Sequence, residues 1–372
     1  MSGVPGQVYL VTGGCGFLGR HLVKMLVERR EGISEIRVFD LHLAGELETL
    51  STDTVTVTLI QGDITDLPPV LRASEGVDSI LHLASVIDFS GAIADSIIMA
   101  VNVQGTCHVI EACLHHGIQY LVYTSSMEVV GPNPKGQSFY RGDEETSYNT
   151  CHKAAYSRSK AIAERLVIEA NGKQVAGGRT LYTCALRPMG IYGEGLGLLT
   201  TMLREASRLG GRLPRLAPAT VQHGHVYVGN VVWMHVLAAR ALQETPEKLG
   251  GQVYYCYDGS PDKSHLDFKM EFLAPCGVRL IARGRRLLPA FLVYLLACLF
   301  ELLRFALRPF CAFAPFLNRT TLAVASTTFT VRTDKAARHF GYRPLFSWEE
   351  SKARTVRWLQ GVQQQATRRG RF

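Results

Sequence analysis

Several features that mark other classes of protein are missing from this 372-residue sequence. Its nine cysteines include no C-x-x-C pair, and an odd total fits no closed disulfide framework. We therefore expect reduced thiols and a main domain that faces the cytosol. The N-terminal stretch MSGVPGQ has no apolar core of the kind that signal peptides carry, so we predict no secretory leader.

Acidic residues are in the minority, and the formal net charge is +8. Nucleic acid would be the first partner to consider for such a charge, but the basic residues form no stripe with interleaved aromatic side chains. They gather instead at residues 279–288, beside a hydrophobic run, and in the C-terminal tail. A basic cluster beside apolar residues favours contact with anionic lipid. The sequence thus predicts a membrane surface as a partner, no nucleic acid and no metal site.

A glycine-rich turn follows the first predicted strand, VYLVT at residues 8–12. Gly13, Gly16 and Gly19 form the pattern G-x-x-G-x-x-G and lead into a helical repeat of apolar residues. Glycines permit a tight turn and close approach of the backbone to a pyrophosphate, while the following helix offers free N–H groups. Because the turn lies between a strand and a helix, we predict that it binds a dinucleotide.

The second predicted strand, EIRVFD, ends in Asp40, roughly 20 residues beyond the glycine turn. A carboxylate there can accept hydrogen bonds from both ribose hydroxyls of NAD and would repel the 2′-phosphate of NADP. The next residues, Leu41 and His42, include no arginine for that phosphate, whereas Arg20 after the glycines could still contact one. We predict NAD as the cofactor. Asp63, at the end of the third strand, is expected to face the adenine.

Predicted strands alternate with helical segments as far as residue 190, which is typical of an α/β fold with a doubly wound parallel sheet. Ligands of such sheets bind at the carboxyl ends of the strands. A smaller C-terminal substrate lobe and a hydrophobic membrane segment complete the expected fold. We divide the chain into four parts. Residues 1–193 form an NAD-binding Rossmann domain, and residues 194–286 form a substrate lobe whose strand and helix at 225–242 return to the Rossmann core. Residues 287–317 form a membrane-associated segment, and residues 318–372 form the C-terminal part of the lobe with a basic tail.

The stretch AAYSRSKAIAE places Tyr156 one helical turn before Lys160. Alone, this spacing most often belongs to an ordinary amphipathic helix, because residues i and i+4 share a helix face. The preceding strand, which ends in Ser125 and Ser126, changes that interpretation, since the helix should pack beside it. A phenol next to an ammonium can act as a base toward an alcohol, and a serine hydroxyl can orient the substrate oxygen. We predict catalytic roles for Tyr156, Lys160 and Ser126, and prefer Ser126 to Ser125 because of its distance from the following glycine.

Motifs along nearly the whole chain resemble those of extended short-chain dehydrogenases/reductases. They are T-G-G-x-G-F-L-G at 12–19, Asn102-Val103-x-Gly105-Thr106, Tyr156-x-x-Ser159-Lys160 and LRPMGIYGEG at 186–195. Within that class, YTSSMEVVGPN and TDKAARHFGYRPLFSWEES are similar to the 3β-hydroxysteroid dehydrogenase/Δ5-Δ4 isomerase family. The loops GQSFYRGDEETSY and CYDGSPDKS look closest to the branch of that family that acts on C27 sterols in bile acid synthesis. Ser157-Arg158 departs from the pattern, since many relatives have a proline there, but this affects the shape of the loop rather than the Tyr-x-x-Ser-Lys core.

The resemblance implies oxidation of the 3β-hydroxyl of a Δ5-sterol by NAD, followed by movement of the double bond from Δ5 to Δ4. The implied reaction converts 7α-hydroxycholesterol to 7α-hydroxycholest-4-en-3-one. By family position Asp258 would carry a proton from C4 to C6, although an aspartate before a glycine is also a common turn residue. The residues expected to bind the cofactor are Gly13, Gly16, Phe17, Leu18, Gly19, Asp40, Asp63, Ala84, Asn102, Tyr156, Lys160 and Pro188.

A long hydrophobic segment occupies residues 287–317. Its uninterrupted apolar part, 287–300, is shorter than the roughly 20 residues that a helix needs to cross a bilayer. Glu301, Arg304 and Arg308 fall on one helical face, which favours an amphipathic helix in the membrane interface. A spanning helix and a helix buried in a soluble lobe are the alternatives. With the resemblance, the segment predicts the endoplasmic reticulum membrane as the location, and a homodimer is one candidate assembly.

Other functions are compatible with parts of the pattern. A C19/C21 steroid dehydrogenase/isomerase of hormone synthesis, or a decarboxylating sterol-4-carboxylate 3-dehydrogenase, would share the motifs and the membrane segment. A soluble nucleotide-sugar epimerase would lack the segment 287–317. A non-enzymatic NAD sensor would typically have lost Tyr156 or Lys160, and this chain keeps both.

Overall fold

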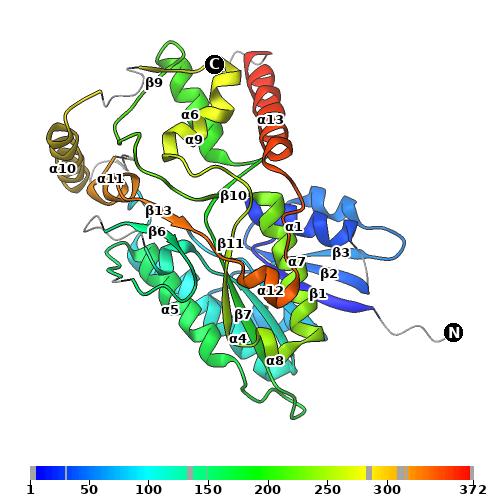
Figure 1. The fold of residues 1–372 in the computed structure, drawn as a ribbon. Coiled ribbons are helices and arrows are strands. Elements are labelled where there is room, and N and C mark those ends of the chain that lie inside the picture. The colour runs from blue at the N-terminus through cyan, green and yellow to red at the C-terminus, as the bar shows by residue number, and fades with distance from the viewer. Residues whose placement is uncertain are drawn as a thin grey trace.

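A sheet of seven parallel strands forms the centre of the molecule (Figure 1). The computed structural model describes residues 6–29, 32–131, 137–148, 150–281, 287–307, 315 and 317–368. The strand order is β11-β7-β5-β4-β1-β2-β3, so the winding direction reverses between β1 and β4. The strands are β1 (Gln7–Thr12), β2 (Ile33–Asp40), β3 (Thr56–Gln61), β4 (Ser79–His82), β5 (Tyr120–Thr124), β7 (Tyr182–Pro188) and β11 (Gln252–Cys256).

Helices cover both faces of this sheet. They are α1 (Phe17–Glu28), α2 (Leu67–Ser74), α4 (Gly105–His116), α5 (Ala155–Ala170) and α7 (Val228–Glu244). In β1, Tyr9 and Val11 pack into one core with α1 and α7, whereas Leu10 packs into a second core with α2, α4 and α5. This alternation follows from the two-residue period of a strand. The predicted α/β fold with a doubly wound parallel sheet is therefore confirmed.

Six strands of the sheet are predicted from the sequence, and the structure adds a seventh. This strand, β11, pairs in parallel with β7, with Tyr254 beside Leu186. A short apolar run such as QVYYC does not distinguish a strand from a buried helix, which is why periodicity does not reveal it. The strand and the helix predicted at 225–242 pack in two different places. β10 (His225–Tyr227) pairs with β8 (Gly190–Tyr192) in a separate small sheet, and α7 packs on α1.

Three helices lie together at one end of the molecule (Figure 1): α6 (Gly197–Arg208), α9 (His265–Leu273) and α13 (Trp348–Arg368). They share a third core, in which the Tyr192 ring stacks on Phe272 with centroids 5.2 Å apart. The smaller elements are η1 (Gly45–Leu50), α3 (Asp95–Met99), η2 (Ala100–Gln104), η3 (Met127–Val129), β6 (Phe139–Gly142), β9 (Arg212–Pro214), α8 (Pro246–Leu249), η4 (Ala274–Cys276), β12 (Arg279–Ile281), α11 (Arg319–Ala325), β13 (Phe329–Val331) and α12 (Lys335–Phe340).

Helix α10 (Ala290–Leu307) stands at the edge of the molecule with little of its surface covered (Figure 1). By length and composition it could cross a membrane, as could the continuous helical stretch at 95–116, which is far more buried. Its large exposed side chains are Phe291, Tyr294, Leu295, Leu299, Leu302, Leu303 and Phe305. Of its charged residues, Glu301 pairs with Arg319, and Arg304 donates to the carbonyl oxygens of Ser90 and Gly91. This exposure disagrees with burial in a soluble lobe. Four arginines that the sequence places in the basic cluster or on the helix face lie outside the described residues: Arg283, Arg285, Arg286 and Arg308.

All eight described cysteines are free thiols, as predicted; Cys311 lies outside the described residues. Burial raises the pKa of the Cys113 and Cys184 thiols to about 12. These two cysteines therefore stay protonated and pack as small apolar residues of the core.

Buried histidines should make the fold sensitive to acid. Burial lowers the pKa of His82 to about 3, and that of His223 and His235 to about 4. Below the unperturbed pKa of about 6.5, the unfolded chain binds protons that the folded chain excludes. Each such histidine should therefore remove about 1.4 kcal/mol of unfolding free energy per pH unit, from pH 6.5 down to its folded pKa.

Urea unfolding between pH 7.5 and pH 4.5, followed by tryptophan fluorescence, measures this slope. His235→Gln should reduce the slope, because the unfolded variant has one fewer group to protonate. A slope that does not change in this variant would contradict the assignment of His235 as a neutral buried group.

Candidate active site

The glycine turn between β1 and α1 is packed too tightly for side chains. Gly13 has φ +69°, and a Cβ built on it would lie 2.7 Å from the Cα of Ala84. A Cβ on Gly19 would lie 2.3 Å from the carbonyl oxygen of Gly13. Gly16 caps α1 with no side-chain hydrogen bond, so the N–H groups of Phe17 and Leu18 in the first turn have no side-chain cap. This is a cradle of backbone donors that fits a pyrophosphate.

Asp40 ends β2 next to this turn. Its Oδ2 accepts a hydrogen bond from the Cys15 N–H at 2.9 Å, and its Oδ1 is 3.3 Å from the His42 N–H. The guanidinium of Arg20 is held by the Cys15 carbonyl oxygen and by Glu46. Arg20 is therefore engaged within the protein, and β2 ends in a carboxylate beside the glycine turn. Both features fit NAD better than NADP.

The other residues expected at the cofactor lie along the same edge of the sheet. Asp63 follows β3 and accepts hydrogen bonds from Thr65, Ala84 follows β4, and Pro188 ends β7. Asn102 lies in η2, a turn of π-helix between α3 and α4. Turns of this kind recur at functional sites.

The amide of Asn102 is fully used within the protein. Its Nδ2 donates to the Val86 carbonyl oxygen at 2.9 Å and to Ser159 Oγ at 2.8 Å, and its Oδ1 accepts from the Val86 N–H at 2.7 Å. Asn102 therefore ties the loop after β4 to helix α5. Its contact with a cofactor stays a prediction.

Tyr156 and Ser126 meet where α5 begins beside the end of β5. Both residues are buried, and the Ser126 hydroxyl lies close enough to the Tyr156 phenol to lower its pKa. The Phe89 ring packs edge-on against Tyr156 with centroids 5.2 Å apart. Burial raises the pKa of Tyr156 above its usual value, while the nearby Ser126 hydroxyl lowers it. The resting phenol is therefore neutral, and a nearby cation is needed to favour the phenolate.

Lys160 lies one turn further along α5 and supplies an amine in the same buried region. Its Nζ donates to the Thr124 carbonyl oxygen at 2.7 Å and to Tyr123 Oη at 3.2 Å. Burial lowers the pKa of Lys160 to about 7, and the nearby Glu164 carboxylate opposes this shift. Lys160 can thus exchange a proton near neutral pH.

A buried ion pair behind these residues is not predicted from the sequence. Glu164 binds Arg187 through two contacts of 2.6 and 2.8 Å and accepts a third hydrogen bond from Ser125 Oγ at 2.6 Å. Ser125 is therefore occupied by Glu164, whereas Ser126 faces Tyr156. The available sequence signal was the spacing of Lys160 and Glu164, which puts both on one face of α5.

Asp258 follows β11 and is surrounded by N–H donors. Its carboxylate accepts from the Tyr227 N–H, the Asn230 side chain and the Ser260 N–H, each at 2.8 Å. These bonds hold the junction of β10 and α7, which is the structural role of a turn aspartate. Its predicted part in proton transfer is not tested by this geometry.

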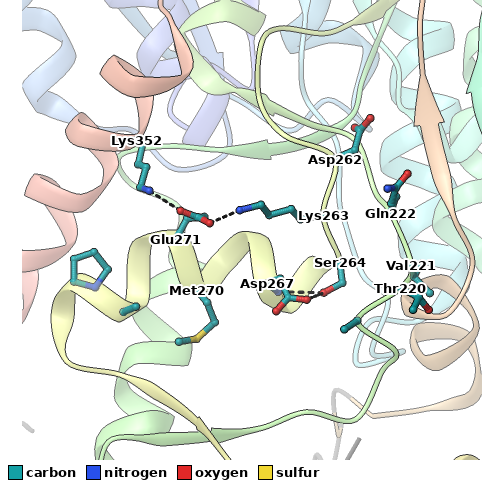
Figure 2. Close-up of a pocket in the computed structure, with 13 residues that line it drawn as sticks. Thr220, Val221, Gln222, Asp262, Lys263, Ser264, Asp267, Met270, Glu271 and Lys352 are labelled. Carbon is teal, nitrogen blue, oxygen red and sulfur yellow. Dashed lines mark hydrogen bonds and ion pairs between the residues drawn. The ribbon is translucent and has the colours of Figure 1, made fainter. Parts of the chain in front are cut away.

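A cavity of about 720 Å³ lies elsewhere, in the lobe that contains α9 (Figure 2). Lys263 and Lys352 there both pair with Glu271. None of the predicted catalytic or cofactor-binding residues lines this cavity.

Known proteins match this chain over almost its whole length. The "3 beta-hydroxysteroid dehydrogenase type 7" of Mus musculus is 57% identical over 360 residues, which cover 97% of each chain. The protein of the same name from Homo sapiens is 58% identical over 355 residues, covering 95% of this chain and 96% of its own. Among solved structures, DesIV, a dTDP-glucose 4,6-dehydratase from Streptomyces venezuelae with NAD bound, has a TM-score of 0.69 at 21% identity and covers 96% of this chain and 98% of its own. At that identity the likeness shows the fold alone.

The sequence profile of one family matches residues 10–287, a range that contains the glycine turn, Asp40, Ser126, Tyr156 and Lys160. This match, and the 57% and 58% identity to the two relatives along almost the whole chain, confirm the resemblance seen in the sequence motifs. The chain belongs to the 3-beta hydroxysteroid dehydrogenase/isomerase family.

Proposed function

We propose that this protein oxidises the 3β-hydroxyl of 7α-hydroxycholesterol with NAD and shifts the double bond from Δ5 to Δ4, giving 7α-hydroxycholest-4-en-3-one in bile acid synthesis. The observation that carries the proposal is the 57% identity over 97% of the chain to a relative named 3 beta-hydroxysteroid dehydrogenase type 7. The loops that resemble the C27 branch support the choice of sterol. The Asp40 carboxylate and the engaged Arg20 support NAD.

In the dehydrogenation, Tyr156 would take the proton from the 3β-hydroxyl. Ser126 would donate a hydrogen bond to the same oxygen and hold it as charge develops. The glycine cradle and Asp40 would hold NAD, which would supply the hydride acceptor for C3 of the sterol. The proximity of the Ser126 hydroxyl to the Tyr156 phenol supports this assignment, because one substrate oxygen can then reach both groups.

Lys160 would assist by its charge. Its ammonium lies in a buried region, where a cation favours the phenolate form of a nearby tyrosine strongly. Glu164 raises the pKa of Lys160 and so increases the fraction that carries the charge at neutral pH. Asp258 is the position that the family resemblance assigns to the later proton transfer, but its three N–H donors favour a role in holding β10 and α7.

The location we propose is the endoplasmic reticulum membrane, with the sheet on the cytosolic side. The exposed Leu and Phe side chains of α10 support it, because each contributes about 1.5–3 kcal/mol when it leaves water. The charged groups of Glu301 and Arg304 are satisfied within the protein, so they do not oppose contact between the rest of the helix and lipid.

Purified protein with NAD should convert 7α-hydroxycholesterol to the conjugated enone faster than it converts a C19 3β-hydroxy-Δ5-steroid. NADH formation and the product spectrum measure both rates. A preference for the C19 steroid would favour the hormone-synthesis branch, and release of CO₂ from a sterol-4-carboxylate would favour the decarboxylating enzyme.

Tyr156→Phe should lower the rate of sterol oxidation at least about 100-fold while NAD still binds, because only the transferable proton is lost. NADH formation measures this rate. A Tyr156→Phe variant with more than about a tenth of the wild-type rate would exclude Tyr156 as the base.

The choice between NAD and NADP should depend on Asp40. The double variant Asp40→Ala, Leu41→Arg removes the carboxylate that repels a 2′-phosphate and adds a cation that attracts it. We expect the ratio of kcat/KM for NAD to that for NADP to fall at least about tenfold, measured with one saturating sterol. The single variant His42→Ala, which leaves the Asp40 carboxylate in place, is the control. A wild-type enzyme already faster with NADP would contradict the assignment.

Membrane attachment should resist high salt and yield to detergent, because salt screens charges but does not weaken apolar burial. Replacing Leu295, Leu299 and Leu303 with lysine should move the protein toward the soluble fraction after centrifugation. Leu209→Lys is the control, since Leu209 is exposed at the end of α6 and lies outside α10. Recovery of the unmodified protein in a salt-washed supernatant would refute attachment through α10.

A further inference from the structure

Tyr123, a buried tyrosine of β5, contacts the amine that assists the proposed dehydrogenation. Its side chain is 1% exposed and belongs to the core that the sheet forms with α2, α4 and α5. Lys160 Nζ donates to Tyr123 Oη at 3.2 Å and lies 4.7 Å from the centroid of the Tyr123 ring. A hydroxyl oxygen and the face of an aromatic ring both attract a cation, so this side chain offers two contacts to the ammonium.

The hydrogen bonds behind Tyr123 have a definite direction. Thr106 Oγ1 donates to the Asn102 carbonyl oxygen at 2.7 Å, because a carbonyl oxygen can only accept. The Thr106 oxygen is therefore left to accept from His82 Nε2 at 2.9 Å, and His82 Nδ1 accepts from the Thr12 hydroxyl at 2.7 Å. Burial lowers the pKa of His82 to about 3, so its ring stays neutral in this tautomer.

This network leaves the Tyr123 oxygen free to accept from Lys160. Burial raises the pKa of Tyr123 well above its usual value, and the nearby Thr106 hydroxyl opposes that shift. The Tyr123 phenol therefore keeps its proton, which it can direct toward Thr106, and its oxygen retains a lone pair for the ammonium. A neutral acceptor of this kind favours the charged form of a lysine.

Lys160 needs such support because its charge is only partly stabilised by other groups. On α5 the titratable groups near it are Tyr156 and Glu164, and the Glu164 carboxylate is shared with Arg187 of β7. On β4 the group is His82, which is neutral. Burial lowers the pKa of Lys160 to about 7, and Glu164 opposes this shift. A small change in its contacts would therefore change how often Lys160 is charged at neutral pH.

We propose that Tyr123 is a positioning residue of the dehydrogenation, whose hydroxyl and ring keep Lys160 charged so that the ammonium favours the phenolate of Tyr156. This inference rests on the roles proposed above for Tyr156 and Lys160. Tyr123 acts through Lys160 rather than on the reacting atoms. The Thr124 carbonyl oxygen, which also accepts from Lys160 Nζ, belongs to the main chain and is present whatever side chain occupies position 123.

Tyr123→Phe removes the hydroxyl and keeps the ring. Oxidation requires the Tyr156 phenolate, so its rate rises with pH, and a less often charged Lys160 should move the midpoint of this rise to higher pH. Loss of a hydrogen bond to a charged group corresponds to a shift of about one pH unit or more. Below the midpoint, kcat should fall about tenfold or more, while KM for the sterol stays within about twofold. NADH formation at saturating NAD, measured across pH, gives both quantities.

Two further variants make this test specific. Tyr123→Leu removes the ring as well as the hydroxyl and should move the midpoint further than Tyr123→Phe. Tyr120→Phe is the matched control, since Tyr120 lies on the same strand but packs against the core on the other face of the sheet. It should leave the midpoint unchanged. A midpoint in Tyr123→Phe within about 0.2 pH unit of wild type would overturn the proposal, because a merely structural defect lowers the rate without moving the midpoint.

A measurement without turnover keeps this proposal separate from the proposed function. An unfolded lysine holds its proton up to a pKa of about 10.4, whereas folded Lys160 releases its proton near pH 7. Lys160 should therefore make the unfolding free energy rise with pH above about 7. Tyr123→Phe lowers the folded pKa further, so this rise should begin about one pH unit lower.

Urea unfolding across pH 5.5 to 9 measures this rise in four proteins: wild type, Tyr123→Phe, Lys160→Met and the double variant. The effect of Tyr123→Phe on the pH dependence should disappear when Lys160 is methionine. An effect that persists there, or that is absent when Lys160 is present, would overturn the proposal. Wild-type protein that oxidises no 3β-hydroxysteroid would refute the proposed function, and the unfolding data would still decide whether Tyr123 keeps Lys160 charged.

Discussion

The arrangement of this site depends on how helix α5 is fastened to the carboxyl ends of β5 and β7. Lys160 donates to a carbonyl oxygen of β5, and Glu164, one turn later, binds Arg187 of β7 while accepting from Ser125. A buried ion pair is stabilising only when its remaining hydrogen-bonding groups are satisfied, and the contact with Ser125 meets part of that requirement. Because Tyr156 belongs to the first turn of the same helix, the network fixes its distance from Ser126.

The parts of the site that depend on neighbouring residues in the chain were predicted from the sequence. The glycine turn, Asp40 at a strand end and the Tyr156–Lys160 pair are each defined by spacing along one or two elements, and the fold and family are confirmed. The pairing of β11 with β7 joins segments far apart in the chain, and no local pattern encodes it. The Glu164–Arg187 pair was missed for the same reason, since it links a helix to a strand.

Glu128, which is buried in η3 after β5, and Asp258, which follows β11, illustrate what sequence alone cannot supply. Both are acidic residues near strand ends, and the family position drew attention to Asp258 alone. The two side chains differ in their hydrogen-bond partners. Asp258 accepts three N–H bonds, whereas the side chain of Glu128 accepts one hydrogen bond from Ser157. The protonation behaviour of a carboxyl group follows from such partners and from burial, neither of which can be read from residue identity.

The contact between Arg304 of α10 and the carbonyl oxygens of Ser90 and Gly91 connects this helix to the loop that touches Tyr156. Phe89, the residue before them, packs against Tyr156, and Asn318 at the start of α11 donates to the Phe89 carbonyl oxygen. Asp88 stiffens the same loop by accepting hydrogen bonds from the N–H groups of Ser90, Gly91 and Ile93. These contacts connect α10, the loop at 88–93 and the Tyr156 ring, so a shift of α10 against the sheet would reach the ring through two contacts.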